Sequence, residues 1–286
     1  MILLDYRPVA VANLMVGIGR GFHADSVSEH SLRSMILTTV KKVVREYSPG
    51  YGKLVIASEG DRYWRRDYFP YYKANRKSRT DAGIDWREVV KIMDSIRDEI
   101  AEFMPYVSVH VPEAEADDVI AVLATSVDTL EPKLIVSGDR DFVQLQQHPG
   151  VEQYDYTRDR WVRHADPAAQ LKEKIIRGDA GDGVPNFLTD GDVFVTPGKR
   201  SRPIMTPKFE AWMKQDPSEF CDTQEKKDNW ERNKTLVDFS SIPEAVKRAV
   251  LNRYAEAAAT VPPRHGVAQY LTSKRLAMLA MDAQDF

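Results

Sequence analysis

The chain has little cysteine, no long apolar run and no excess of positive charge. Cys221 is the only cysteine among 286 residues, which excludes an internal disulfide and a zinc ribbon. No apolar stretch reaches the length that crosses a bilayer, and the six histidines show no close metal-type pairing. Forty basic and 43 acidic residues give a net charge of −3, so nucleic-acid binding would have to come from local clusters. We therefore expect a soluble, cytoplasmic protein without membrane contact.

Hydrophobic residues make up 43% of the chain and allow a sizeable core. Four short apolar runs predict strands, at Ile2–Leu4, Lys53–Ser58, Val107–His110 and Lys133–Ser137. Amphipathic helices are predicted between them, at His30–Tyr47, Asp85–Met104 and Glu115–Ser126. Apolar strands that alternate with helices are typical of a parallel sheet covered on both faces. The first half of the chain thus predicts an α/β domain.

The pattern changes after residue 150. Val151–Val162 suits a short hairpin. The stretch 178–208 is rich in Gly, Pro, Asp and basic residues, which predicts loops around short helices. The remaining residues are mostly helical in pattern. We expect an α/β domain over residues 1–178 and a smaller helical domain over residues 179–286.

Acidic residues gather at the ends of the predicted strands. Asp5 follows the first strand and Glu59 the second, and the run SGDRDF comes directly after the strand KLIVS. Ligands of parallel α/β sheets bind outside the carboxyl ends of the strands. The helix start EADD and the loop GDAGDG supply further acids. The full set of candidate metal ligands is Asp5, Glu59, Glu115, Asp117, Asp139, Asp141, Asp179 and Asp182.

Each of these motifs alone has an ordinary explanation. Acids at a helix start cap the helix, and an aspartate after a strand or in GDAGDG is common turn chemistry. Together, however, converging carboxylates repel each other unless cations neutralise them. Oxygen ligands without a His or Cys cluster favour two Mg²⁺ or Mn²⁺ ions over zinc. Such a site suits phosphodiester hydrolysis by a two-metal mechanism.

Residues 62–79 (RYWRRDYFPYYKANRKSR) differ from the rest of the chain in charge. They contain seven basic residues, one acid and six aromatics. One interpretation is a solvated charged helix whose aromatic side chains pack on the core. The other is a substrate clamp, because basic groups bind phosphates and exposed aromatic rings stack on unpaired bases. Beside an acidic metal site, a cation here would also stabilise charge that develops on the scissile phosphate.

The combined motifs resemble a known family. Asp5 after the first strand, WRRDYFPYYKANR, EADDVIAVLA, SGDRDFVQL and GDAGDGVPN are similar to the motifs of the 5′ nuclease (flap endonuclease) superfamily. The later segments DFSSIPEAVKRAVLNRY and VPPRHG extend the resemblance over nearly the whole chain and narrow it to the ribonuclease H branch of T-even bacteriophages. The resemblance implies a PIN-like parallel-sheet domain, an arch at about residues 62–84, and a helix–three-turn–helix element that grips duplex DNA.

The resemblance also implies roles for individual residues. The tighter metal site would consist of Asp5, Glu115, Asp117 and Asp139, and the second site of Asp141, Asp179 and Asp182. Lys73 and either Arg65 or Arg66 would be the arch cations nearest the scissile phosphate. The expected nucleic-acid contacts are Arg62, Arg76, Lys77, Arg79, Tyr71 and Tyr72 in the arch, and Lys199, Arg200, Arg202 and Lys208 after it.

The sequence departs from the family pattern at three points. Glu59 stands where the family has an aspartate after the second strand, and Asp61 is the alternative ligand. Helical spacing places Asp118 on the face of Glu115, whereas the family motif uses Asp117. After GDGVPN, the run LTDGDVFVTPGKRSRPIMTPK replaces the hairpin of cellular relatives. Duplex DNA would therefore be gripped differently, with basic side chains of this run as phosphate contacts.

The resemblance implies a structure-specific 5′→3′ exonuclease and flap endonuclease of the ribonuclease H type. Its substrates would be RNA/DNA or DNA/DNA duplexes with single-stranded 5′ ends, in RNA primer removal during phage lagging-strand replication. We expect a monomer, with the phage single-stranded-DNA-binding protein and sliding clamp as further partners. Two alternatives remain. One is a phosphatase of the haloacid dehalogenase type, whose nucleophile pattern DRDFV fits, and the other is a non-catalytic nucleic-acid-binding replication protein.

Overall fold

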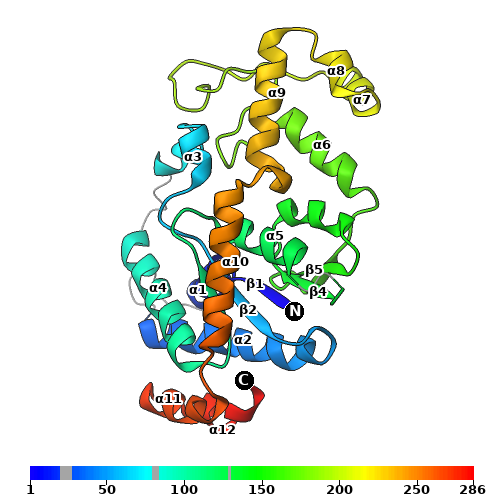
Figure 1. Ribbon diagram of the computed structural model, residues 1–286. Coiled ribbons are helices and arrows are strands. Elements are labelled where there is room, and N and C mark those ends of the chain that lie inside the picture. Colours follow the sequence, from blue (N-terminus) through cyan, green and yellow to red (C-terminus); the bar gives the residue numbers. More distant parts are fainter. Residues whose placement is uncertain (20–27, 79–83, 128–129) are drawn as a thin grey trace.

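The computed structural model describes residues 1–19, 28–78, 84–127 and 130–286, and within them one sheet forms the centre of the fold (Figure 1). Its strands are β1 (Ile2–Asp5), β2 (Leu54–Ser58), β3 (Val107–His110), β4 (Lys133–Val136), β5 (Val151–Asp155) and β6 (Arg160–Val162). Their order is β3-β2-β1-β4-β5-β6. Strands β1 to β5 are parallel, and β6 returns antiparallel to β5. The predicted parallel α/β sheet and the predicted hairpin are therefore confirmed.

Helices cover both faces of the sheet, because alternate strand residues point to opposite sides. These helices are α1 (Tyr6–Gly19), α2 (Glu29–Tyr51), α4 (Trp86–Phe103), α5 (Ala116–Ser126) and α10 (Glu244–Ala259). Leu4 and Ile56 pack with α1, α2 and α4 on one face. Leu3 and Val55 pack with α5 and α10 on the other. Burial on both faces is the physical reason why the strands read as continuous apolar runs.

The helices that the sequence predicts before the hairpin are present, with small differences at their ends. α2 begins behind its N-cap Ser28 and runs through Pro49, so it is longer than the predicted helix at each end. α4 begins after Asp85, whose carboxylate accepts hydrogen bonds from the backbone N–H groups of Arg87 and Glu88. The sequence pattern does not predict α1, because its residues are apolar nearly throughout and lack a clear polar face.

The chain after β6 is mostly helical and contributes most of a third group of buried side chains. Besides α10, its helices are α6 (Pro167–Arg177), α7 (Thr206–Lys214), α8 (Pro217–Phe220), α9 (Gln224–Val237), α11 (Val267–Ser273) and α12 (Ala277–Met281). Phe220 and Trp230 lie in this group. In Figure 1, α7, α8 and α9 lie at the top, whereas α11 and α12 lie at the bottom and pack with the first face of the sheet. The buried Asn233 of α9 donates to the carbonyls of Ile175 and Pro185, each at 2.8 Å. These bonds fix α9 against the end of α6.

Residues 178–205 form turns and irregular backbone, closed at their start by a bridge between Asp179 and Val184. The sequence predicts loops around short helices over residues 178–208, and the structure forms a helix in this range only from Thr206, where α7 begins. Gly178 ends α6 with a φ of 70°, and a side chain there would meet the backbone of Val184 and Pro185. This glycine lets the chain reverse tightly, so that the GDAGDG loop turns back toward the sheet.

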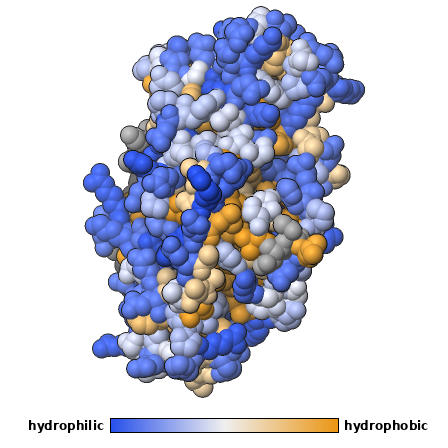
Figure 2. Space-filling view, viewed as in Figure 1, coloured by the Kyte–Doolittle hydropathy of each residue, from blue (hydrophilic) through white to orange (hydrophobic). Residues whose placement is uncertain are grey.

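None of the described helices is long and apolar enough to cross a bilayer. Figure 2 shows a mostly hydrophilic face, with apolar surface gathered beside α10 in the middle of the molecule.

Candidate metal centre

Asp5 lies at the carboxyl end of the central strand β1 and is almost fully buried. Its carboxylate accepts a hydrogen bond from the Ser137 hydroxyl at 2.9 Å, just after β4. Burial raises the pKa of Asp5 to about 7. The Ser137 hydrogen bond opposes this rise, while the negative charges of Asp139 and Glu59 add to it. The Asp5 carboxylate at the end of β1 is therefore only partly compensated by positive charge.

Asp117, in the first turn of α5, belongs to the same electrostatic environment. Burial raises its pKa well above the ordinary value, and the charges of Asp5 and Asp139 raise it further. Asp139 lies after β4 and caps the 3₁₀ helix η3 (Arg140–Gln147), accepting from the Asp141 N–H at 2.9 Å. Three carboxylates from β1, α5 and the β4–η3 turn thus repel each other at one edge of the sheet.

Glu115, the N-cap of α5, faces positive groups instead. Its Oε2 accepts from Arg65 Nη1 at 2.8 Å and from the Tyr72 hydroxyl at 3.0 Å, and its Oε1 accepts from Lys73 Nζ. Burial opposes ionisation of Glu115, but the charges of Lys73 and Arg65 outweigh it and lower the pKa. We call Asp5, Glu115, Asp117 and Asp139 the first acidic group.

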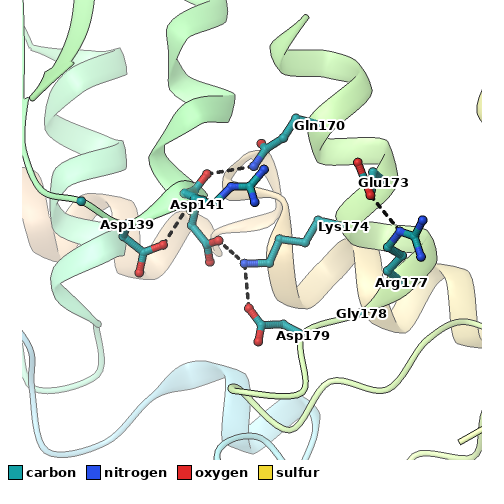
Figure 3. A pocket seen from close by; sticks show the side chains of 10 residues that line it. Asp139, Asp141, Gln170, Glu173, Lys174, Arg177, Gly178 and Asp179 are labelled. Carbon is teal, nitrogen blue, oxygen red and sulfur yellow. Dashed lines mark hydrogen bonds and ion pairs between the residues drawn. The ribbon is translucent and has the colours of Figure 1, made fainter. Parts of the chain in front are cut away.

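Asp141, Asp179 and Asp182 form a second acidic group, with one carboxylate oxygen of each lying within 4.8 Å of the others. Lys174 of α6 lies between two of them, bonded to Asp141 and 3.0 Å from Asp179 (Figure 3). Burial raises the pKa of Asp141 to about 6, against the opposing charge of Lys174. A pocket of about 430 Å³ opens beside Asp139, Asp141, Lys174 and Asp179.

The second acidic group has the geometry to hold a divalent metal ion, because one carboxylate oxygen of each member lies within 4.8 Å of the others. The first acidic group offers the same kind of donor, and the charges of its carboxylates raise the pKa values of Asp5 and Asp117. All donors of the two groups are carboxylate oxygens, which Mg²⁺ and Mn²⁺ prefer. Burial is the main cause that raises the pKa of Asp5, Asp117 and Asp141, and the charges of Lys73 and Lys174 lower it only in part. A bound cation would supply the missing positive charge.

The structure separates the two alternative ligands after β2. Glu59 lies close enough to Asp5 to raise its pKa, and it also pairs with Arg7 at 2.9 Å. Asp61 is exposed. Burial lowers the pKa of His110, and the charge of Asp61 opposes this change. This placement favours Glu59.

The structure also distinguishes Asp117 from Asp118. Asp118 is fully buried and accepts hydrogen bonds from the Glu115 N–H at 3.0 Å and from Trp64 Nε1 at 3.1 Å. The bond from the Glu115 N–H is one half of a capping box at the start of α5, and the bond from Trp64 fixes Asp118 further. Asp118 therefore fixes the helix end, and the arrangement favours Asp117 as the ligand.

Residues 62–78 of the arch fold back on the acidic groups as α3 (Trp64–Tyr68), a turn and the 3₁₀ helix η2 (Ala74–Ser78). Lys73 has a φ of 55°, a conformation that non-glycine residues rarely adopt. It is held there by its N–H bond to the Asp182 carbonyl at 2.7 Å and by its side-chain bond to Glu115. Unfavourable backbone conformations that the surroundings maintain are frequent at functional sites.

The two candidate arginines of the arch have opposite environments. Arg65 is 2% exposed and bonded to acids, so it is not placed to meet a phosphate. Arg66 is exposed, stacks on the Tyr63 ring and donates to the Tyr72 carbonyl at 3.3 Å. Of the expected stacking rings, Tyr71 is 41% exposed but Tyr72 is 3% exposed. The buried Tyr72 ring is not available to bases in this conformation.

The other expected nucleic-acid contacts lie mostly on the surface. Arg62 is exposed, and Arg76 reaches Asp182 at 2.5 Å. The Lys77 side chain and Arg79 lie outside the described residues. Lys199 pairs with Asp190 and Asp192, and Arg202 pairs with Glu225, while Arg200 and Lys208 are also exposed. The structure therefore does not gather these four residues at the acidic groups.

Sequence reasoning missed Lys174, Arg140 and Arg177, which line the pocket beside the acidic groups. One signal was available for Lys174, because it lies in the last turn of α6, just before GDAGDG. A helix that ends beside an acidic loop can direct such a side chain onto it.

Comparisons with known proteins show which family the sequence and the fold match. The profile of the family described as "5'-3' exonuclease, N-terminal resolvase-like domain" matches residues 19–175, and the profile "T4 RNase H, C terminal" matches residues 166–286. Ribonuclease H of Enterobacteria phage T4 is 29% identical over 294 residues, covering 99% of this chain and 95% of the phage protein. Flap endonuclease Xni of Shewanella woodyi is 27% identical over 183 residues, covering 58% of this chain and 67% of Xni.

Solved structures show the same fold. The flap endonuclease of bacteriophage T5, in a pseudo-enzyme–product complex with DNA and metal ions, matches with a TM-score of 0.61 at 16% identity. The match covers 91% of this chain and 99% of the T5 chain. The T5 5′-exonuclease with divalent zinc ions matches with a TM-score of 0.60, covering 90% of this chain and 99% of that one. Because the first family profile spans more than half of the sequence, the chain belongs to the 5′-3′ exonuclease family of 5′ nucleases.

Proposed function

We propose that the chain is a divalent-metal-dependent, structure-specific 5′ nuclease that hydrolyses phosphodiesters near the 5′ ends of nucleic acids. The observation that carries the proposal is the second acidic group, in which three carboxylates lie close enough to hold one ion and two of them contact Lys174. Lys73 joins it to the first group, because its ammonium bonds Glu115 and lies 3.7 Å from Asp182. Family membership and the whole-length similarity to a phage ribonuclease H support it.

The proposed ligands of two Mg²⁺ or Mn²⁺ ions are the first acidic group, with Glu59 beside it, and the second acidic group. When bound, such ions polarise a phosphodiester and lower the pKa of a coordinated water. Lys73 is the protein cation proposed to act with them, because it reaches both groups, which Arg65 does not. The Lys73 side chain is 8% exposed, and its ammonium bonds Glu115 of the first group and lies 3.7 Å from Asp182 of the second. A positive charge there would stabilise the charge that develops on the scissile phosphate.

We propose that the single-stranded 5′ end meets the exposed part of the arch. Arg62, Arg66, Arg76 and Tyr71 present charges and a ring to solvent there. The duplex would contact the helical domain, residues 179–286, through Lys199, Arg200, Arg202 and Lys208. Lys199 and Arg202 are held by surface acids, which phosphates would have to replace as partners.

The proposed biological role is narrower than the proposed chemistry. We infer 5′→3′ exonuclease and flap endonuclease activity on RNA/DNA and DNA/DNA duplexes, for RNA primer removal in phage lagging-strand replication. The relative that supports this role is the ribonuclease H of phage T4. A monomer in the host cytoplasm that meets the phage single-stranded-DNA-binding protein and sliding clamp belongs to the same proposal.

A flap-cleavage assay tests the proposal. A duplex with a 5′-labelled single-stranded flap is incubated with the protein and Mg²⁺, and the products are resolved by length. We expect cleavage near the junction that EDTA abolishes and that Asp139→Asn also abolishes. Binding without any cleavage would indicate the non-catalytic alternative. Trapping of an aspartyl-phosphate on Asp139 would indicate the phosphatase.

A further inference from the structure

Arg65 is a buried cation at the base of the arch. Its side chain is 3% exposed, and its Nη1 contacts Glu115 at 2.8 Å and Asp118 at 2.8 Å. Its Nε donates to the Leu236 carbonyl at 2.8 Å, near the end of α9. Its guanidinium also lies over the Trp64 ring, 4.6 Å from the centroid. Arg65 therefore connects the arch, the start of α5 and the helical domain.

The Arg65 contacts have a geometric consequence for Glu115. Asp118 is held by Trp64 and by the Glu115 N–H, so it provides Arg65 with a fixed partner. Arg65, positioned in this way, donates to Glu115 Oε2 while Lys73 bonds Oε1. A planar guanidinium fixes the direction of its bonds, whereas an ammonium acts as a point charge. Arg65 and the Tyr72 hydroxyl thus both hold Glu115 Oε2, and of the two cations on this carboxylate the Arg65 guanidinium has the more defined direction.

We propose that Arg65 is a positioning residue, which orients Glu115 within the first acidic group and ties that group to the end of α9. This inference rests on the proposed nuclease function. It replaces the expectation that Arg65 meets the scissile phosphate, because its donors face acids and a carbonyl inside the protein. The arch, the acidic groups and the helical domain are then coupled through one side chain.

The test uses the full chain with Arg65→Lys and Arg65→Gln. Single-turnover flap cleavage is measured with saturating enzyme, and flap affinity is measured by fluorescence anisotropy in EDTA. Mn²⁺ affinity is measured without nucleic acid by isothermal titration calorimetry. Loss of a group that orients a metal ligand typically costs about 10- to 100-fold in affinity or activity. We expect losses of about that size in cleavage rate and Mn²⁺ affinity for both variants, with flap affinity changed by less than about threefold.

Arg33 provides the matched control, because it is a buried arginine away from the acidic groups. It is 5% exposed and bonds Glu99 at 2.6 Å and 3.0 Å. Arg33→Lys and Arg33→Gln should lower thermal stability without changing Mn²⁺ affinity or the rate per folded molecule. If the Arg65 variants do not fold, Asp118→Asn removes the fixed partner and should weaken Mn²⁺ binding in the same direction.

Three outcomes would overturn the proposal while the wild-type protein remains an active nuclease. Arg65→Lys could behave like wild type, which would show that charge alone suffices. Cleavage and flap affinity could fall together with unchanged Mn²⁺ affinity, which would make Arg65 a substrate contact. The Arg33 variants could lose Mn²⁺ affinity equally, which would make the effect one of general stability. Absence of wild-type cleavage would instead refute the proposed function itself.

Discussion

Lys174 of α6 donates a hydrogen bond to Asp141 of η3, although 33 residues separate the two in the sequence. The same ammonium pairs with Asp179 at 3.0 Å, so one lysine supplies positive charge to two of the three carboxylates of the second acidic group. Burial opposes the charge on Lys174, but the two aspartates outweigh it and raise its pKa. Lys174 is therefore an internal cation at the place proposed for a metal ion.

Replacement of Lys174 by a neutral residue should make the free energy of unfolding depend on Mg²⁺. We expect Lys174→Met to lower the free energy of unfolding by about 3 kcal/mol in EDTA, because it leaves the partly buried carboxylates of Asp141 and Asp179 uncompensated. Mg²⁺ should stabilise the variant more than wild type, as measured by urea unfolding with and without the ion. Lys172→Met is the control, since Lys172 is on the same helix and donates to the Met213 carbonyl. Equal stabilisation by Mg²⁺ in Lys174→Met and wild type would contradict the prediction.

Asp5 should make metal-free stability depend on pH. Its folded-state pKa of about 7 lies above the ordinary 3.8, so the folded state favours the protonated form. The penalty for ionising Asp5 is absent at low pH and grows as the pH rises from about 4 to 7, on the order of 4 kcal/mol when complete. Asp5→Asn does not carry this penalty.

The Asp5 prediction is checked by urea unfolding in EDTA between about pH 5 and pH 8. The stability difference between Asp5→Asn and wild type should grow in favour of the variant up to about pH 7 and then level off. Cleavage by the variant should nevertheless be abolished, because a metal-site charge is missing. A difference that is independent of pH would show that Asp5 is ionised throughout.

Glu59 and Asp61 should differ in their importance for cleavage. Glu59→Gln should lower cleavage rate and metal affinity by about 10- to 100-fold, because Glu59 lies in the electrostatic environment of Asp5. Asp61→Asn should change either by less than about twofold, since Asp61 is exposed and acts on His110. Cleavage rates measured against Mg²⁺ concentration check both variants. The reverse ranking would mean that Asp61 is the ligand.

Lys73→Ala should affect chemistry more than binding. We expect the single-turnover rate to fall about 100-fold, because a cation next to developing negative charge acts mainly in the transition state. Duplex affinity should stay within about threefold of wild type, since the helical domain is proposed to set it. Rate and affinity are measured on the same flap substrate. A proportional loss of affinity would make Lys73 a ground-state phosphate contact instead.

We expect substitutions of the adjacent residues Tyr71 and Tyr72 to have different effects, the first on recognition of the 5′ end and the second on the free energy of unfolding. Tyr71 is 41% exposed, so Tyr71→Ala leaves no cavity in the core. This variant should mainly weaken the preference of the protein for a free single-stranded 5′ end. Tyr72→Ala should lower the free energy of unfolding by about 3–5 kcal/mol, because the ring is buried and its hydroxyl bridges Glu115 and Asp182. Thermal unfolding and competition between flap and blunt duplex distinguish the two. Loss of stability in Tyr71→Ala alone would reverse the assignment.

The sequence by itself determined the sheet and the acids at its edge. Apolar runs bounded by helices are sufficient to predict a parallel sheet, and the chain direction then places Asp5 and Asp139 at the same edge. Motif spacing was also sufficient to indicate the family, which the profile match shows. These features depend on local pattern, so they can be read without knowledge of contacts.

Only the tertiary structure decided which way the side chains of the arch and of α6 point. Arg65 and Arg66 are neighbours with the same chemistry, yet the first is buried among acids and the second is exposed. The difference arises because Arg65 meets Glu115 and Leu236, which lie 50 and 171 residues further along the chain. Contacts across such distances depend on how α3, α5 and α9 pack, and no local pattern in the sequence encodes that packing.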